Sequence, residues 1–281
     1  QNGNLLIEYL CKQVRPCRYE AKDAGILQMP RKTFRTVLTA ISPVIVIFAA
    51  AAASALPAGD GCARSRGGMV ASACPLATAV GVRVLDSGGN AVDAAVAVGF
   101  ALAVTYPQAG NIGGGGFMLI RTEDGETAFI DFREKAPAGA HRDMYLDEKG
   151  EVVEDLSIRG HLASGVPGSV AGLWKAHELY GSLEWEYLLA PSIDLAGGGF
   201  PVSAHLRSSL EKLSVKLESW PDLLKFYGEG GTLPEKGWLL LQPDLEKTIR
   251  RIAGEGPEGF YGGETARLLA AEMSRGGGLI T

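Results

Sequence analysis

Four consecutive glycines at positions 113–116 constrain this chain more than any other feature, because they separate a helix from two strands. The segment that follows Asp93, up to Val104, is uncharged and dominated by alanine and valine, which predicts a helix that is apolar on every side and therefore buried. Asn90 is placed to cap this helix, and Asp93 lies where a carboxylate meets the free N–H groups of the first turn. We expect Tyr106 and Pro107 to end the helix.

Two strands are predicted after the glycines. Residues 117–121 (FMLIR) have the composition of a buried strand, residues 123–126 (EDGE) that of a hairpin turn, and residues 127–133 that of the returning strand. A phosphate-binding loop has the order strand, glycines, helix. Here the order is helix, glycines, strand, so the phosphate interpretation is poor. The residues alone favour glycines that allow backbones to pack closely.

Three segments of this region form a longer pattern. They are residues 88–95 (GGNAVDAA), residues 107–117 (PQAGNIGGGGF) and residues 131–134 (DFRE). In this order they resemble the large-subunit signature of the γ-glutamyltranspeptidases, a family of N-terminal-nucleophile hydrolases. The similarity extends from about Gly67 to Thr281. It implies an α/β (α+β) fold in which this chain forms part of a four-layer αββα sandwich.

The resemblance also implies a reaction. The family hydrolyses glutathione or transfers its γ-glutamyl group to a peptide, an amino acid or water through a γ-glutamyl-threonine intermediate. Its nucleophile is a threonine freed by self-cleavage, whose own α-amine acts as the base. That threonine opens a small subunit with a Thr-Thr-His run, and no such run occurs here. We therefore expect an N-terminal fragment of the precursor, interrupted after Thr281 and inactive alone, with no catalytic residue and no cofactor.

Arg133 is the one substrate-binding residue that the resemblance assigns to this chain. In the family, the arginine of the Asp-Phe-Arg-Glu motif binds the α-carboxylate of the γ-glutamyl group. A guanidinium suits this role because its planar fork donates two parallel hydrogen bonds to a carboxylate. The alternative is that Arg133 merely pairs with Asp131, two residues away on the same strand face. The motif favours substrate binding.

The N-terminal segments predict export. We interpret residues 1–28 as an upstream extension and residues 29–55 as a signal peptide, with a basic start, an apolar run and a small-residue cleavage site. The alternative is an uncleaved anchor helix. Residues 56–66 would form the mature N-terminal tail, and residues 67–281 the incomplete N-terminal portion of the large-subunit domain. The predicted location is periplasmic or secreted, with membrane contact only through the signal segment.

Charge, cysteines and histidines narrow the partners. Residues 1–55 hold 7 of the 27 Lys and Arg and 3 of the 32 Asp and Glu, which leaves a net charge of −9 on residues 56–281. Such an acidic domain is a poor candidate for binding nucleic acid. Cys62 and Cys74 can form a disulfide after export or remain free thiols. The histidines lack metal-ligand spacing, and we predict no metal site; they are His141, His161, His177 and His205.

The remaining sequence predicts further elements. They are a short strand at residues 69–71, a helix from Pro75 to Asp86, a helix capped by Ser169 and ending at Tyr180, a helix at residues 191–196, and a helix at residues 205–220 with a leucine stripe (Leu206, Leu210, Leu213 and Leu217). Two more helices are predicted at residues 245–253 and 264–274, separated by a loop at residues 254–261. Ser169 lacks the Gly-x-Ser-x-Gly turn of a serine hydrolase.

Two other functions remain open at this level. A related acylase, such as a cephalosporin or glutaryl acylase, would use the same scaffold. A non-catalytic exported binding domain could keep the arginine that contacts glutamate. Glutathione and other γ-glutamyl compounds are the expected ligands, and the small subunit from the same precursor is the expected protein partner.

Overall fold

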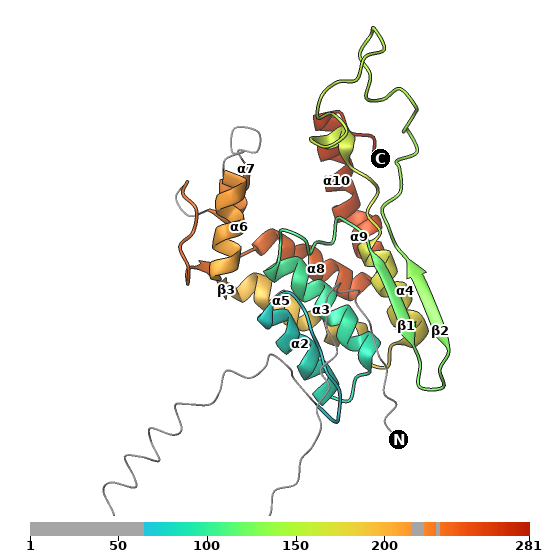
Figure 1. The fold of residues 1–281 in the computed structure, drawn as a ribbon, viewed down its shortest axis with the longest axis vertical. Helices are drawn as coiled ribbons and strands as arrows, with labels where there is room; N and C mark the ends of the chain where they lie inside the picture. The colour runs from blue at the N-terminus through green and yellow to red at the C-terminus, as the bar shows by residue number, and fades with distance from the viewer. Residues whose placement is uncertain (1–64, 215–221, 229–230) are drawn as a thin grey trace, which may run out of the picture. The chain divides into compact units, whose positions relative to one another are not determined.

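The computed structural model describes residues 65–214, 222–228 and 231–281, and Figure 1 shows their arrangement. The described part is mostly helical, with two small antiparallel sheets of two strands each. The predicted mixed class, α/β (α+β), is confirmed. The predicted extension, the signal peptide, residues 56–64 of the predicted tail, Cys62 and Leu217 lie outside the described residues.

The core is built around helix α3 (Ala91–Thr105), which packs between α2 (Pro75–Asp86) and α5 (Trp185–Gly198) (Figure 1). Helix α8 (Pro243–Glu255) packs on α5, and α4 (Ser169–Tyr180) packs on α3. Small residues on α3 allow this close approach: a side-chain carbon added at Gly99 would lie 3.1 Å from Leu173 of α4. The largest fully buried core side chains include Phe100, Leu188, Leu189, Ile249 and Ile252.

The helix boundaries follow from local sequence. Pro75 occupies the first position of α2, where its missing N–H costs no hydrogen bond. Asn90 caps α3: its side-chain oxygen accepts from the backbone N–H of Val92 and Asp93, while the Asp93 carboxylate accepts from the Asn90 backbone N–H at 2.9 Å. This is the reciprocal capping pattern expected from the sequence. Tyr106 ends α3, as predicted.

Strands β1 (Phe117–Arg121) and β2 (Thr127–Asp131) form an antiparallel hairpin in which Phe117 pairs with Asp131 and Arg121 with Thr127. The predicted turn lies between them, with Gly125 at φ +91°. Strand β2 is two residues shorter than predicted. The expectation of a buried β1 is wrong for one face: Met118 and Ile120 are buried, whereas Phe117 and Leu119 are 46% and 48% exposed. The alternation follows from the two-residue period of a strand.

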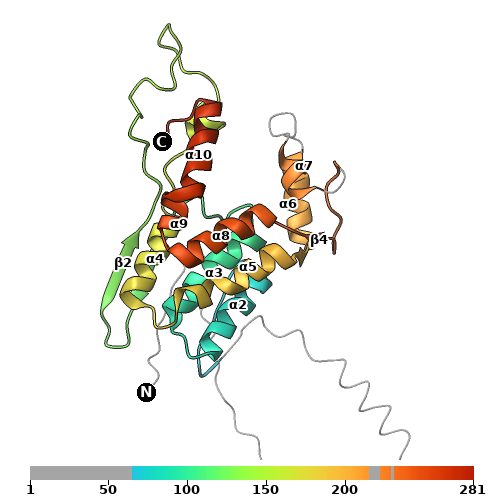
Figure 2. The same cartoon turned by 180° about the vertical axis from the view of Figure 1, so that it is seen from behind.

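The C-terminal half adds smaller elements (Figure 2). Strands β3 (Phe200–Pro201) and β4 (Leu239–Leu240) pair antiparallel. The remaining helices are the 3₁₀ turn η1 (His161–Ala163), α6 (Ala204–Ser214), α7 (Asp222–Tyr227), α9 (Glu258–Tyr261) and α10 (Gly263–Gly276).

Several local predictions are confirmed and three are wrong. Helices α2, α4, α5, α8 and α10 lie where the sequence predicts helices, and Leu206 and Leu210 of the stripe are buried in the core. Residues 69–71 form no strand. Ser169 does not cap α4, because Gly168 precedes the helix and no side-chain cap bond forms. The predicted loop at residues 254–261 contains α9 and the last two residues of α8. No helix among the described residues is both long and apolar enough to cross a membrane.

Candidate functional site

The glycine run packs directly against the end of β2 and the start of α4. The carbonyl of Gly114 accepts from the backbone N–H of Gly168 at 2.7 Å and of Ser169 at 3.0 Å. Gly116 exchanges two backbone hydrogen bonds with Phe132, which extends the hairpin ladder by one pair. A side-chain carbon at Gly115 would lie 2.5 Å from the Phe132 carbonyl oxygen. The close-packing interpretation of the glycines is therefore confirmed.

Arg133 projects from this junction, two residues after β2 ends. Its backbone N–H donates to Asp131 Oδ1 at 3.0 Å, which fixes the chain as it leaves the strand. Its side chain is 64% exposed, and its guanidinium carbon lies 5.8 Å from the centre of the Phe117 ring. The aromatic ring supports one face of the guanidinium plane. Arg133 is thus held at its base and open at its tip.

The side-chain partner of Arg133 differs from the alternative considered from sequence. Arg133 Nε donates to Glu134 Oε2 at 3.2 Å, and Asp131 receives only the backbone N–H. Among the described residues, no hydrogen bond is made by the two terminal guanidinium nitrogens of Arg133. A bidentate pair with an incoming carboxylate can therefore form at these nitrogens while Glu134 keeps the side chain in place.

A pocket of about 230 Å³ lies next to Glu134. Its wall combines two segments: residues 134–145, which follow the arginine, and residues 162–165, which include part of η1. The backbones of Lys135 and Val166 exchange two hydrogen bonds, of 3.2 and 2.8 Å, which clamp the segments together. A side-chain carbon at Gly165 would lie 2.9 Å from Cβ of Glu134, so this position has no room for a side chain.

A larger and more open hollow of about 690 Å³ lies on α2 and the residues before it, lined by Ser72, Thr78 and Arg83 among others. None of its lining residues contacts Arg133 in the hydrogen bonds or ion pairs of the structure, and it is not part of this candidate site.

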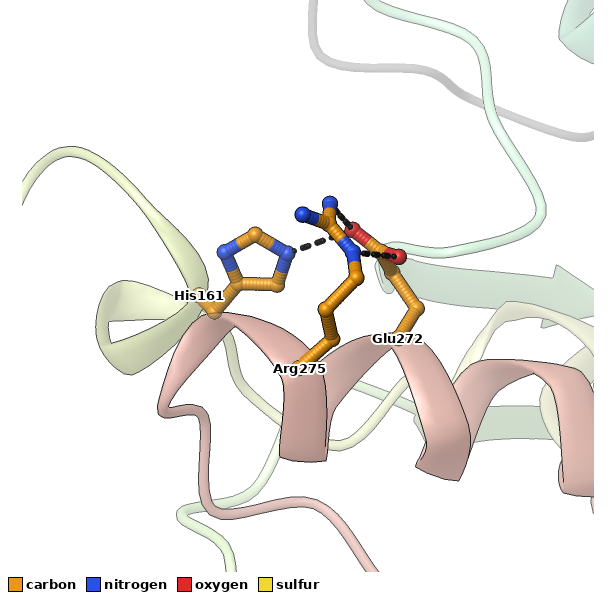
Figure 3. Close-up of polar contacts among 3 residues, drawn as sticks. All are labelled: His161, Glu272 and Arg275. Atoms are coloured by element: carbon orange, nitrogen blue, oxygen red, sulfur yellow. Dashed lines mark hydrogen bonds and ion pairs between the residues drawn. The ribbon is translucent and has the colours of Figure 1, made fainter.

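His161, the residue before the lining residue Leu162, forms a polar cluster with Glu272 and Arg275 (Figure 3). His161 Nε2 lies 2.7 Å from Glu272 Oε1 of α10, and Arg275 Nε donates to Glu272 Oε2 at 2.8 Å. Arg275 also contacts Glu272 Oε1 through a terminal nitrogen. The hydrogen bonds from Arg275 and then from His161 lower the pKa of the Glu272 carboxyl from 4.5 to about 2. The carboxylate is therefore ionised throughout the neutral range.

The other polar candidates have structural surroundings. His177 lies 2.7 Å from the Leu183 carbonyl and contacts the rings of Trp174 and Trp185, while His205 stacks on Tyr106. In the described part of the chain, no three His, Cys, Asp or Glu side chains are grouped so that they could hold a metal ion. Cys74 has no disulfide partner among the described residues, so its pairing with Cys62 stays a prediction.

Residues 77–281 match the family model described as gamma-glutamyltranspeptidase. The chain belongs to this family. It is 45% identical to the glutathione hydrolase proenzyme of Pseudomonas sp. (strain A14) over 262 residues, which are 90% of this chain and 43% of that protein.

Solved structures agree with this family assignment. The crystal structure of Helicobacter pylori gamma-glutamyltranspeptidase aligns with a TM-score of 0.76 at 42% identity, over 78% of this chain and 63% of that one. The cephalosporin acylase of Bacillus halodurans aligns with a TM-score of 0.65 at 26% identity, over 74% of this chain and 39% of that one. The chain thus spans less than half of the curated relative and less than two thirds of the Helicobacter pylori chain.

Family membership places the described helices and the β1–β2 hairpin within the αββα sandwich of the γ-glutamyltranspeptidases. Two features of the site were not predicted from the sequence, namely the pairing of Arg133 with Glu134 and the pocket behind Glu134. The first had a visible signal, since Glu134 follows Arg133 in the same motif. The second had none, because residues 134–145 and 162–165 are brought together only by the fold.

Proposed function

We propose that this chain forms the N-terminal part of an exported γ-glutamyltranspeptidase precursor, and that Arg133 binds the α-carboxylate of its γ-glutamyl donor. The proposed reaction is hydrolysis of glutathione, or transfer of its γ-glutamyl group to a peptide or an amino acid. Family membership supports the reaction class, and the name of the Pseudomonas relative supports glutathione as the substrate. The activity belongs to a protein completed to the length of its relatives, including the small subunit.

The observation that carries the proposal is the open tip of the Arg133 guanidinium. Its Nε is engaged by Glu134 at 3.2 Å, and its terminal nitrogens make no hydrogen bond to any described residue. A carboxylate arriving from solvent therefore meets two parallel N–H donors on a side chain that is already oriented. Because the backbone around Arg133 is fixed by Asp131 and by the glycine junction, little reorganisation accompanies binding.

Chemistry at the γ-carbonyl requires a nucleophile, which we propose to be the threonine of a Thr-Thr-His run that is absent from this sequence. In the proposed mechanism, self-cleavage of the completed precursor frees a threonine whose α-amine accepts the proton of its hydroxyl. The hydroxyl oxygen attacks the γ-carbonyl carbon, the amine of cysteinylglycine leaves with a proton, and a γ-glutamyl ester remains. Water or an acceptor amine then attacks the ester and regenerates the hydroxyl. Arg133 holds the donor at its other end throughout.

The decisive experiment compares variants in a completed, self-cleaved enzyme. Replacing Arg133 by Ala should lower kcat/KM for a γ-glutamyl donor, since the donor carboxylate loses its partner. The decrease should correspond to a loss of about 2–5 kcal/mol of transition-state stabilisation. Arg133→Lys keeps the charge without the fork and should recover only part of this loss. Arg142→Ala is the matched control, because Arg142 is an exposed arginine whose described ion pair is with its neighbour Asp143. Unchanged kcat/KM in matured Arg133→Ala enzyme would refute the assignment.

The 281-residue chain alone should neither cleave itself nor release colour from γ-glutamyl anilides. Both reactions need the missing threonine. Purified chain, freed of host enzyme and incubated with the anilide, tests this, and a denaturing gel reports self-cleavage. Turnover by the purified chain would show that a catalytic group lies within it.

Export is proposed on the same terms. We expect removal of residues up to about Ala55, because a basic segment, an apolar run and a small-residue site follow one another after Met29. N-terminal sequencing of protein recovered from the periplasm or the medium decides it. An exported protein that begins upstream of Val37 would contradict cleavage and favour the uncleaved anchor.

The alternative with a specific observation in its favour is an acylase, given the structural similarity to the cephalosporin acylase of Bacillus halodurans. The two functions can be distinguished by comparing the turnover of two substrates. A transpeptidase should prefer a γ-glutamyl amide over the matching glutaryl amide, which lacks the α-amine, whereas a glutaryl acylase should show the opposite preference. A non-catalytic binding domain would bind γ-glutamyl compounds and turn over neither.

A further inference from the structure

The pocket beside Glu134 has no role in the function proposed so far. It is lined by Glu134, whose carboxylate accepts from Arg133, and by a second charged residue, Lys135. The rest of the lining combines apolar side chains, among them Met144 and Leu162, with the hydroxyl groups of Tyr145 and Ser164, and its surface is about equally polar and apolar. This lining is more polar than that of a typical drug-sized site, and it therefore suits a small polar ligand.

The two charged residues are not in the same state. The carboxylate of Glu134 is engaged by Arg133 at 3.2 Å. Lys135 has no ion-pair partner among the residues that the structure describes, although its backbone is fixed by two hydrogen bonds to Val166. The pocket wall therefore carries an uncommitted cation on a fixed backbone, and the charge that fits it is a carboxylate.

The chemistry of a γ-glutamyl compound relates this pocket to Arg133. Its α-carboxylate and its γ-amide nitrogen lie at opposite ends of the γ-glutamyl group. When the α-carboxylate is bound by Arg133, the substituent on the amide nitrogen extends into neighbouring space. At about 230 Å³ the pocket is below the roughly 300–1,000 Å³ of drug-sized ligand sites, so it suits an amino acid or a dipeptide.

We propose that this pocket binds the amino acid or dipeptide on the amine side of the γ-glutamyl bond, with Lys135 pairing with the free carboxylate of that ligand. The proposal rests on the function proposed above and extends it to the leaving group and the acceptor. Leu162 and Ala163 of η1 line the pocket, and the contact of His161 with Glu272 joins η1 to α10. Lys135 makes no contact with the reacting atoms in this scheme and acts as a specificity-determining residue.

The test uses the completed, self-cleaved enzyme and two acceptors, glycylglycine and glycylglycine amide. They differ in the carboxylate that Lys135 would bind. With γ-glutamyl-p-nitroanilide as the donor, wild-type enzyme should prefer glycylglycine by about 1.5- to fivefold in KM, the range of a partly exposed charge pair. Lys135→Ala should abolish this preference and leave hydrolysis of the anilide within about twofold, because the anilide carries no carboxylate on its leaving group.

Three comparisons make the outcome decisive. Lys135→Arg should retain most of the preference, since it keeps the charge. Lys149→Ala removes an exposed lysine that lies between the two pocket segments and does not line the pocket, and it should behave as wild type. If Lys135→Ala raises KM equally for both acceptors, or leaves the preference for glycylglycine unchanged, the pocket assignment is overturned. A wild-type enzyme that turns over no γ-glutamyl donor would instead refute the proposed function, so the two failures are distinguishable.

Discussion

Asp93 and Arg133 both lie in segments that carry the family pattern, yet their surroundings are opposite. Asp93 is fully buried at the start of α3 and accepts from the Ser182 backbone at 3.0 Å, the Ser182 hydroxyl at 2.5 Å and the Asn90 backbone at 2.9 Å. Arg133 is mostly exposed, and among the described residues its side chain hydrogen-bonds to Glu134 alone. A buried charge whose hydrogen bonds are all made within the chain is structural, whereas an exposed fork with unused donors is available to a ligand.

The regions around these residues differ in the same way. The helices near Asp93 bury their apolar faces against one another, and Asn90 donates to the Tyr180 carbonyl at 2.7 Å to join the start of α3 to the end of α4. The hairpin that leads to Arg133 buries one face and exposes the other, where Phe129 is 62% exposed. The helical core is thus completed by this chain's own contacts. The hairpin keeps one apolar face exposed to solvent.

The largest expected effect is on the core. Replacing Asp93 by Ala leaves the backbone N–H groups of Asn90 and Ser182 buried without their acceptor, which should lower the free energy of unfolding by about 2–4 kcal/mol. Urea unfolding of the chain followed by tryptophan fluorescence measures this. Asp86→Ala, at the exposed end of α2, is the matched control and should shift stability by less than about 0.5 kcal/mol. Equal shifts for the two variants would remove the distinction drawn for Asp93.

A second substitution tests the glycine junction. A side-chain carbon at Gly168 would lie 2.1 Å from the Phe132 carbonyl oxygen, so Gly168→Ala must move backbone and should cost about 1–3 kcal/mol of stability. Gly254 in α8 has no atom within 4 Å of the same added carbon, and Gly254→Ala should stabilise the chain by up to about 1 kcal/mol. In the same unfolding assay, Gly168→Ala should lower the free energy of unfolding and Gly254→Ala should raise it. A neutral Gly168→Ala would show that the junction is less tightly packed than its distances indicate.

A third substitution tests whether Arg133, unlike Asp93, contributes little to stability. Arg133→Ala should change the free energy of unfolding by less than about 0.5 kcal/mol, because its pair with Glu134 is exposed to solvent. The same substitution is expected to impair donor recognition in the completed enzyme. A loss of stability comparable to that of Asp93→Ala would mean that Arg133 holds the junction together rather than serving a ligand.

The smallest expected effect concerns pH and the Glu272 cluster. The folded-state pKa of Glu272 is about 2, below its ordinary value of 4.5, so its ionised form stabilises the fold. This contribution is complete above pH 4.5 and is lost as the pH falls through about 2. The groups that face the carboxylate are Arg275 on its own helix and His161 on η1.

The measurement is the urea midpoint between pH 2 and pH 7 for wild type and Glu272→Gln. The difference in urea midpoint between the two proteins should decrease as the pH falls from 4.5 towards 2. Glu255→Gln, which changes an exposed glutamate on α8, serves as the control and should show no such narrowing. A gap that is constant over this range would contradict a role for the ionised carboxylate.

Much of the helical core could be predicted from the sequence. Pro75, Asn90 and Asp93 mark helix starts through local hydrogen bonding, which depends on neighbours in the chain. The run of small apolar residues after Asp93 shows a buried helix for the same reason. Ser169 misled because serine is common both as a cap and inside a first turn. The backbone position of Gly168, set by the Gly114 carbonyl, decided between them.

The surroundings of Arg133 could be predicted only in part. Its motif identified the residue, and strand alternation placed it near Asp131. The geometry instead gives Asp131 the backbone N–H and gives the side chain to Glu134. Two adjacent residues can turn towards each other only after the strand has ended, and β2 ends at Asp131.

The sequence by itself determined the family, the helical core and the residue with the donor fork, because these depend on local periodicity and on motifs of contiguous residues. Tertiary structure alone decided which glycines are sterically required, which carboxylate orients Arg133, and that residues 134–145 and 162–165 enclose a pocket pinned by His161 on Glu272. These features join residues up to 111 positions apart. Such contacts are fixed by the packing of whole elements, which no local pattern encodes.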